Sequence, residues 1–216
     1  LNETVWAGGE GGLFRGTGSG PFVPVTGLQY DKITALAVDE KSLWDGTDRG
    51  LFAYELTPSK KPRGVPAGVP AKVVPGGPPA DPWQRPGNPV QAFQLPEEFA
   101  KSQTFFVKAD EQRNRVWLGT EQGAFLYDAS GRQLARFTKD NGLPDDKVHV
   151  IDIGEDNRTW FGTMGGLAML EGDNWTTYRK TEGALLDNNV WALLATKVGT
   201  WVGTDGGLQL LDKEGR

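Results

Sequence analysis

Few residues of this sequence could carry acid–base or nucleophilic chemistry, because it contains a single histidine, His149, and no cysteine. Thiolate nucleophiles, disulfides and cysteine-ligated metals are therefore excluded, and no histidine cluster could hold a transition metal. Catalysis would require acidic or tyrosine partners for His149, or a carboxylate pair such as Asp145 and Asp146. Asp145 and Asp146 are adjacent at the start of a strand, where neighbouring side chains point in different directions, so the two carboxylates are poorly placed to act as a pair. The sequence predicts neither a catalytic site nor a cofactor or metal site.

A second set of residues could bind a ligand by stacking or hydrogen bonding. When four short apolar runs are aligned approximately, their second position reads Thr34, Phe106, His149 and Trp191. Aromatic rings and an imidazole in this position suit a planar or carbohydrate ligand. The alternative is that these side chains only fill space.

Polar side chains, among which acids and amides dominate, gather in the predicted turns. The candidates for ligand binding among them are Asp48, Arg49, Glu121, Gln122, Asp145, Asp146, Asn188 and Asp205. Carboxylates and amides bind cations or sugar hydroxyls, yet Asp and Asn are also preferred in tight turns because they hydrogen-bond to nearby backbone. Both interpretations stay open.

Composition restricts the partners. The net charge of −5 and the pI near 5.0 argue against a general affinity for nucleic acid or anionic membranes, which requires clustered Lys and Arg. No apolar stretch approaches the roughly 18 residues of a membrane-spanning helix. The 30 glycines and 14 prolines indicate frequent turns rather than a helical protein.

One short pattern recurs five times and determines the expected fold. Each copy has an apolar residue or a threonine, a tryptophan, one variable residue and a glycine, and a second glycine before another apolar run. The tryptophans of the five copies are Trp6, Trp44, Trp117, Trp160 and Trp201, separated by 38, 73, 43 and 41 residues. Alternating β-branched and aromatic residues on both sides of a glycine-containing turn predict a β-hairpin in each copy.

Further apolar runs flank the hairpins. Runs upstream of the tryptophans predict inner strands at 33–38, 105–109, 148–153 and 190–195, and downstream segments predict outer strands at 133–138 and 175–179. Four antiparallel strands per period of about 40 residues, repeated radially, form the blade of a β-propeller. We therefore predict an all-β propeller with about five blades over residues 1–216. The motif tryptophan should pack between blades, and the motif glycine should let the next blade approach.

The anomalous step of 73 residues contains a proline-rich segment at 58–96, with 11 of the 14 prolines. It reads as a long loop without strand alternation, and its net charge between positions 58 and 89 is +4. One interpretation is a solvated polyproline-like excursion. The other is an arm that docks on a protein partner. The docking candidates are Lys60, Lys61, Arg63, Lys72, Trp83 and Arg85.

The repeats resemble the two-component regulator propeller repeat, whose units read roughly Asn-Gly-Leu-Pro-Asp-Asn, apolar strand, acidic turn and Leu-Trp-x-Gly-Thr-x-x-Gly-Leu. The best match runs from Asp140 through Asp146 to the strand at 148–153, and on through 155–157 to 159–163. This resemblance implies an extracytoplasmic sensor domain, periplasmic or extracellular, in rings of about seven blades. The chain departs from it with five motifs, a first blade without an inner strand and a fifth without an outer strand. It is then a segment of a larger propeller or, alternatively, a closed ring of five blades.

Three functions remain compatible with the sequence. The favoured one is a non-catalytic sensor that binds a small molecule or glycan where turns and connections surround the mouth of the central channel. The second is a structural subunit that docks on a protein through the proline-rich arm. The third is a propeller lyase or glycosidase.

Overall fold

In a computed structural model of the chain, the residues described are 4–17, 21–25, 32–38, 42–47, 50–55, 91–93, 102–128 and 130–212. They form five separate antiparallel sheets, so the all-β prediction is confirmed. The helices among these residues are short 3-10 turns: η2 (Glu111–Arg113), η3 (Lys139–Asn141) and η4 (Lys180–Glu182). Within the same part of the chain, no helix is long and apolar enough to span a membrane.

The sheets follow one another in chain order. The first sheet contains β1 (Thr4–Gly9), β2 (Gly12–Thr17) and β3 (Val23–Pro24), and the second β4 (Ile33–Val38), β5 (Ser42–Thr47), β6 (Gly50–Glu55) and β7 (Gln91–Phe93). The third contains β8 (Thr104–Asp110), β9 (Arg115–Thr120), β10 (Gly123–Asp128) and β11 (Gln133–Phe137). The fourth contains β12 (Val148–Ile153), β13 (Thr159–Thr163), β14 (Gly166–Glu171) and β15 (Asn174–Tyr178). The fifth contains β16 (Val190–Thr196), β17 (Gly199–Thr204) and β18 (Gly207–Leu211).

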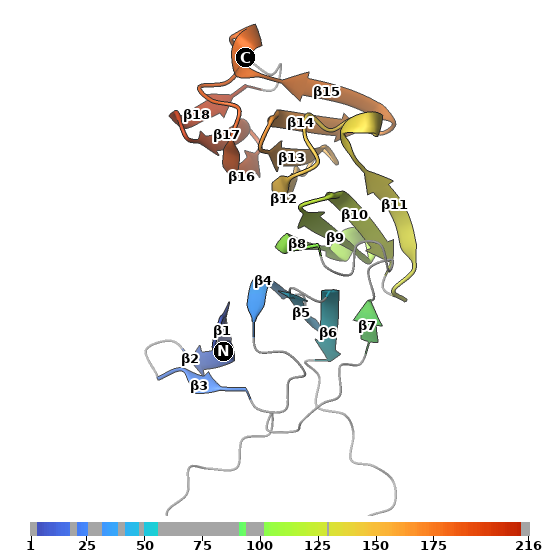
Figure 1. The fold of residues 1–216 in the computed structure, drawn as a ribbon, viewed down its shortest axis with the longest axis vertical. Coiled ribbons are helices and arrows are strands. Elements are labelled where there is room, and N and C mark those ends of the chain that lie inside the picture. Colours follow the sequence, from blue (N-terminus) through green and yellow to red (C-terminus); the bar gives the residue numbers. More distant parts are fainter. Residues whose placement is uncertain are drawn as a thin grey trace, which may run out of the picture.

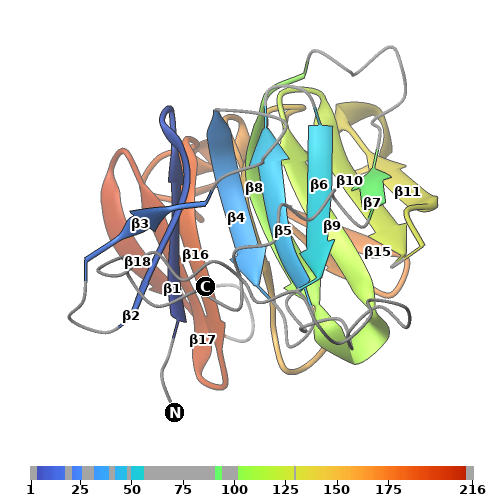
Figure 2. The same cartoon turned by 90° about the horizontal axis from the view of Figure 1, so that it is seen from below.

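The sheets are arranged along an arc (Figure 1). The strands β4, β8, β12 and β16 lie on its inner side, and each contacts the next. Seen from below, the strands of successive sheets run roughly side by side (Figure 2). The first and fifth sheets lie at opposite ends of the arc, so the alternative of a closed ring of five blades is not the observed arrangement. The architecture is β-propeller-like.

The recurring motif forms the hairpin that the sequence predicts, and its threonine closes the turn. The hydroxyl of Thr120 donates to the carbonyl oxygen of Gly123 at 2.9 Å and accepts from the backbone N–H of Gln122 at 3.0 Å. Thr163 makes the same pair of bonds with Gly166 and Gly165. The motif threonine therefore satisfies two backbone groups of a tight turn, which is a structural role.

The core lies between successive sheets. Trp44 and Leu51 of the second sheet pack against Val116 and Leu118 of the third. Trp117 packs against Phe161 of the fourth sheet in the same way, with ring centroids 5.4 Å apart. The predicted role of the motif tryptophan between successive sheets is confirmed for Trp44, Trp117 and Trp160. It is not for Trp201, which is 38% exposed in the fifth sheet.

The motif glycine permits this approach, as the sequence predicts. A Cβ added at Gly119 would lie 2.7 Å from the backbone oxygen of Val148, the first residue of β12 in the next sheet. A Cβ at Gly46 would meet Thr104 of the next sheet at 2.8 Å. Larger residues at these positions would push successive sheets apart.

The proline-rich segment requires a correction at one end. Residues 91–93 form β7, which pairs with β6 through Leu51 and Phe93, so the end of the predicted loop is the fourth strand of the second sheet. Three residues were too short a run to reveal alternation. The docking candidates Lys60, Lys61, Arg63, Lys72, Trp83 and Arg85 lie outside the described residues.

Candidate functional site

A β-bulge near the start of each inner strand leaves one residue without a partner on the neighbouring strand. In β12 the paired residues are Val148 and Val150, and His149 between them is unpaired. The register shifts at the equivalent point of the other inner strands. The four bulged residues are Thr34, Phe105, His149 and Trp191. Because a bulge redirects a side chain, these residues can leave the sheet-to-sheet core.

The sequence alignment was wrong by one residue in β8. Phe106 pairs with Gly119 and is therefore equivalent to Val150 and Ala192, while Phe105 occupies the bulge. Phe106 packs into the apolar core between sheets. The sequence alone could not decide between Phe105 and Phe106, because either phenylalanine fits the apolar pattern of the strand.

Three of the bulged residues form one aromatic row, which we define as Phe105, His149 and Trp191. The imidazole of His149 stacks on Trp191 with centroids 4.1 Å apart and an interplanar angle of 2°. Phe105 meets the other side of this pair edge-on, 5.5 Å from His149. Thr34 does not join the row, because its hydroxyl donates to the carbonyl oxygen of Gly46 in its own sheet.

Trp191 combines exposure with a fixed orientation. Its side chain is 55% exposed, whereas His149 beneath it is 8% exposed. The indole Nε1–H donates to Asp205 Oδ1 at 2.7 Å, and Asn189 Nδ2 donates to Asp205 Oδ2 at 2.8 Å. A held indole with an accessible ring is suited to stacking on a flat ligand, since little side-chain entropy is lost on binding.

The environment of the aromatic row favours the neutral form of His149. Burial lowers the pKa of His149, and the nearby Lys147 cation lowers it further. The hydrogen bond between Nδ1 and the backbone oxygen of Val190, at 3.2 Å, and the carboxylates of Asp145 and Asp205 raise the pKa in part. The net direction is downward, so His149 is an uncharged stacking partner at neutral pH.

The acidic connections mainly build turns. Asp145 Oδ1 accepts from the backbone N–H of Lys147, and Asp146 Oδ1 accepts from that of Lys139, both at 2.8 Å. Asn188 Oδ1 accepts from the backbone N–H of Lys180, also at 2.8 Å. Asp145 and Asp146 therefore serve different turns and do not form a carboxylate pair.

The remaining predicted residues fall into two groups. Glu121 and Gln122 lie in the β9–β10 turn, where the backbone N–H of Glu121 donates to Gln103. Asp48 and Arg49 lie outside the described residues. Within the part of the chain that the structure describes, no group of three acidic, histidine or cysteine residues could hold a metal ion.

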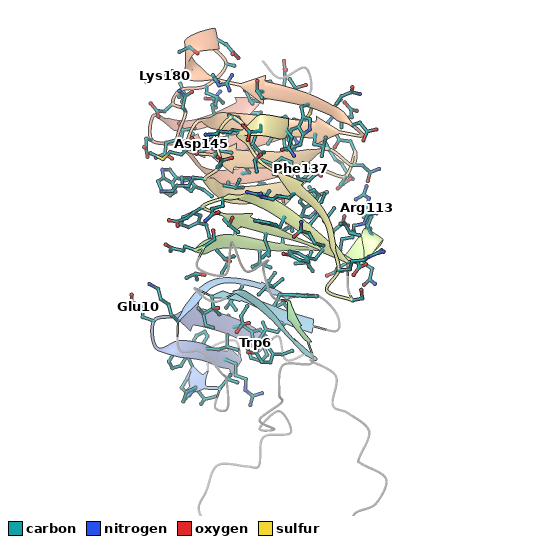
Figure 3. The ribbon with its side chains drawn as sticks, turned by 45° about the vertical axis from the view of Figure 1, so that its right-hand side comes forward. Trp6, Glu10, Arg113, Phe137, Asp145 and Lys180 are labelled. Atoms are coloured by element: carbon teal, nitrogen blue, oxygen red, sulfur yellow. The ribbon has the colours of Figure 1, made fainter. Side chains whose placement is uncertain are left out.

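The motif turns and the connections that lead into the inner strands lie on one side of the stack of sheets. Figure 3 shows Glu10, Asp145 and Lys180 on this side and Arg113 on the opposite side. Lys147 belongs to the same region, with its ammonium 5.9 Å from the centroid of Phe105. Sequence analysis missed Phe105 as a site residue and the bridging role of Asn189. Asn189 gave a weak signal, since it lies two residues before Trp191.

Comparisons with known proteins agree with this architecture. No protein-family model matches the chain, and no curated protein matches it. The extracellular domain of BT3049 from B. thetaiotaomicron, described as a hybrid two-component system, matches with a TM-score of 0.67 and 18% identity over 98% of this chain. The extracellular domain of BT4673 from the same organism matches with a TM-score of 0.62 and 20% identity, also over 98%.

A computationally designed protein, Ika8, matches with a TM-score of 0.60 and 14% identity over 97% of this chain and 56% of its own length. The chain spans about a quarter of the two natural structures, 27% and 26% of their lengths. At these identities the comparisons carry the fold alone. The chain therefore has the β-propeller-like fold found in extracellular domains of bacterial two-component systems.

Proposed function

We propose that this chain is a non-catalytic, extracytoplasmic sensor segment of a larger propeller, and that it binds a small molecule or glycan at the aromatic row. The observation that carries the proposal is the exposed indole of Trp191, stacked on His149 and held by Asp205. Single exposed apolar side chains are common on protein surfaces. An exposed indole fixed from two sides, at the end of the sheets where turns converge, is not explained by packing.

Support for a sensing role comes from the structural neighbours, which are extracellular domains of two-component systems. The alternative of a propeller lyase or glycosidase would need convergent acids. The two carboxylates already described near the row accept hydrogen bonds from the chain itself, Asp145 from a turn and Asp205 from the indole of Trp191. Binding without chemistry is the use that this arrangement favours.

The test is a binding screen with planar aromatic compounds and oligosaccharides, followed by calorimetry on three proteins. We expect the unaltered chain to bind at least one compound and Trp191→Ala to lose the binding. Trp201→Ala is the matched control, because it removes another exposed indole, 38% accessible, from a different face. Equal loss of binding in both variants would refute the site.

The alternative role as a structural subunit depends on the proline-rich arm. Its candidate residues, among them Trp83, lie outside the described residues, so docking through the arm stays a prediction. Deletion of residues 60–85 should abolish capture of a protein partner while leaving ligand binding at Trp191 intact.

A further inference from the structure

The chain contains two methionines, and they have opposite environments. Met169 on β14 is 8% exposed and packs between the fourth and fifth sheets. Met164, in the turn between β13 and β14, is 53% exposed. The fourth sheet has another sheet on each side, so the exposure of Met164 is not that of an uncovered end of the arc (Figure 1).

The turn that contains Met164 does not require a methionine. In the other four copies of the motif the equivalent residue is acidic: Glu10, Asp48, Glu121 and Asp205. In the third, fourth and fifth sheets the backbone N–H at this position donates to the connection that precedes the inner strand, at 3.1 to 3.3 Å. This hydrogen bond uses backbone atoms alone. The thioether of Met164 is therefore available for another role.

The repeat also indicates what lies near Met164. In the fifth sheet Asp205 occupies the equivalent position, and its Oδ1 accepts from the indole N–H of the bulged residue Trp191 at 2.7 Å. The fourth sheet has the same register at this point. Met164 is therefore placed relative to His149 as Asp205 is placed relative to Trp191. The copy that lacks an acid at this position is the copy that contains the histidine.

We propose that Met164 is an oxidation site and that its sulfoxide changes the hydrogen bonding of His149 in the aromatic row. The oxidant is a peroxide, and the inference rests on the proposed function only for its location outside the cytoplasm. The sulfur attacks one peroxide oxygen, the O–O bond breaks, and the other oxygen takes the remaining protons and leaves as water. The thioether is oxidised, the peroxide is reduced, and a polar S=O group replaces an apolar sulfur.

The imidazole of His149 should respond to this new acceptor. Its Nδ1 lies 3.2 Å from the carbonyl oxygen of Val190, which can only accept, so Nδ1 carries the proton and Nε2 has a lone pair. A sulfoxide oxygen near the ring repels this lone pair, and it accepts from the Nε2–H of the imidazolium. Oxidation should therefore raise the pKa of His149. Lys147, Asp145 and Asp205 are the charged groups around it, and oxidation alters none of them.

Peptide mass spectrometry of the full chain treated with hydrogen peroxide tests the site. In the folded chain we expect Met164 to be oxidised about tenfold or more faster than Met169, because only the former is exposed to the oxidant. In denaturant the two rates should become similar, which excludes a difference caused by the neighbouring sequence. Equal rates in the folded chain would overturn the proposal.

NMR titration of the single histidine tests the consequence. Oxidation should raise the pKa of His149, and methionine sulfoxide reductases should restore the original value. Met164→Leu keeps an apolar side chain of similar volume without sulfur, so peroxide should leave the pKa of His149 unchanged in this variant. Met169→Leu is the matched control and should retain the shift.

A sulfoxide at Met164 that leaves the pKa of His149 unmoved would overturn the proposal. A shift that persists in Met164→Leu would also overturn it, because the oxidation would then act through another residue. Neither measurement requires a bound compound. Failure of the ligand screen would therefore refute the proposed function without changing the outcome of this test.

Discussion

Burial lowers the pKa of His149 below its usual range, because it disfavours the charged imidazolium, and the nearby Lys147 cation acts in the same direction. Below the ordinary value of about 6.5 the unfolded chain takes up a proton first, so the stability contributed by neutral His149 is present above this pH and is lost on acidification. The chain has one histidine, so its imidazole proton resonances report on this residue alone.

The first prediction concerns this titration. We expect a pKa below 6.5 for His149 by NMR, and a value closer to 6.5 in Trp191→Ala, because removal of the indole exposes the ring to water. Trp201→Ala should leave the pKa of His149 unchanged. A pKa of His149 that does not respond to Trp191→Ala would show that the stack does not control the titration.

Asp45 is an acidic residue at a buried position. It occupies the variable position of the motif, where other copies have Leu118, Phe161 and Val202, and it is buried. Burial raises the pKa of Asp45 to about 7, opposed in part by a hydrogen bond with Tyr54. Among the described residues its Oδ1 has no hydrogen-bond partner. The folded chain therefore favours the protonated carboxyl.

This position leads to the second prediction. Because the folded pKa of Asp45 is raised, the stability that this residue contributes is fully present below its unfolded pKa of about 3.9 and is lost as the pH rises to about 7, by at most ~1.4 kcal/mol per pH unit. Asp45→Asn should flatten this part of the pH profile in urea unfolding. Glu121→Gln, at an exposed turn, should leave the profile unchanged. An unchanged profile in Asp45→Asn would place the titration elsewhere.

Among the structural elements, contact between successive sheets depends on the motif glycines. The third prediction compares Gly119→Ala with Gly203→Ala. The first should lower the free energy of unfolding by about 2 kcal/mol, because the new Cβ meets the backbone of Val148. The second should cost under about 1 kcal/mol, because it meets only Ala192. Equal costs in chemical denaturation would mean that sheet contact does not determine the glycine requirement.

Inner strands of three successive sheets are joined by one carboxylate. Asp152 on β12 accepts from Lys108 Nζ on β8 at 2.8 Å and from the backbone N–H of Ala195 on β16 at 2.8 Å. The side chain of Asp152 is largely buried. A buried acceptor with two partners stabilises more than an exposed ion pair.

The fourth prediction follows from this bridge. Asp152→Ala should lower the free energy of unfolding by about 2–3 kcal/mol, because it leaves the N–H of Ala195 unpaired. Glu171→Ala removes an exposed pair with Arg158 and should cost less than about 1 kcal/mol. Similar losses for the two variants would contradict the bridging role of Asp152.

The elements were largely predictable from the sequence, whereas the contacts between them were less so. The observed β4 and β12 have the predicted bounds, because apolar alternation is a local signal. The choice between Phe105 and Phe106 depends on a bulge, which does not alter the apolar pattern. The bridge from Asp152 could not be foreseen, because it joins residues more than 40 positions apart in different sheets.

At the scale of the whole molecule, the repeats form an arc with the aromatic row on one side. The row occupies bulges of β8, β12 and β16, so three successive sheets must be in place before it exists.

The most direct test of the proposed site is NMR of the His149 imidazole and the Trp191 indole N–H while screened aromatic compounds and oligosaccharides are added. We predict that a binding compound shifts both resonances together and saturably, and that the imidazole shift disappears in Trp191→Ala. If compounds bind the chain but leave both resonances unmoved, the aromatic row is not the ligand site and the proposed function is wrong.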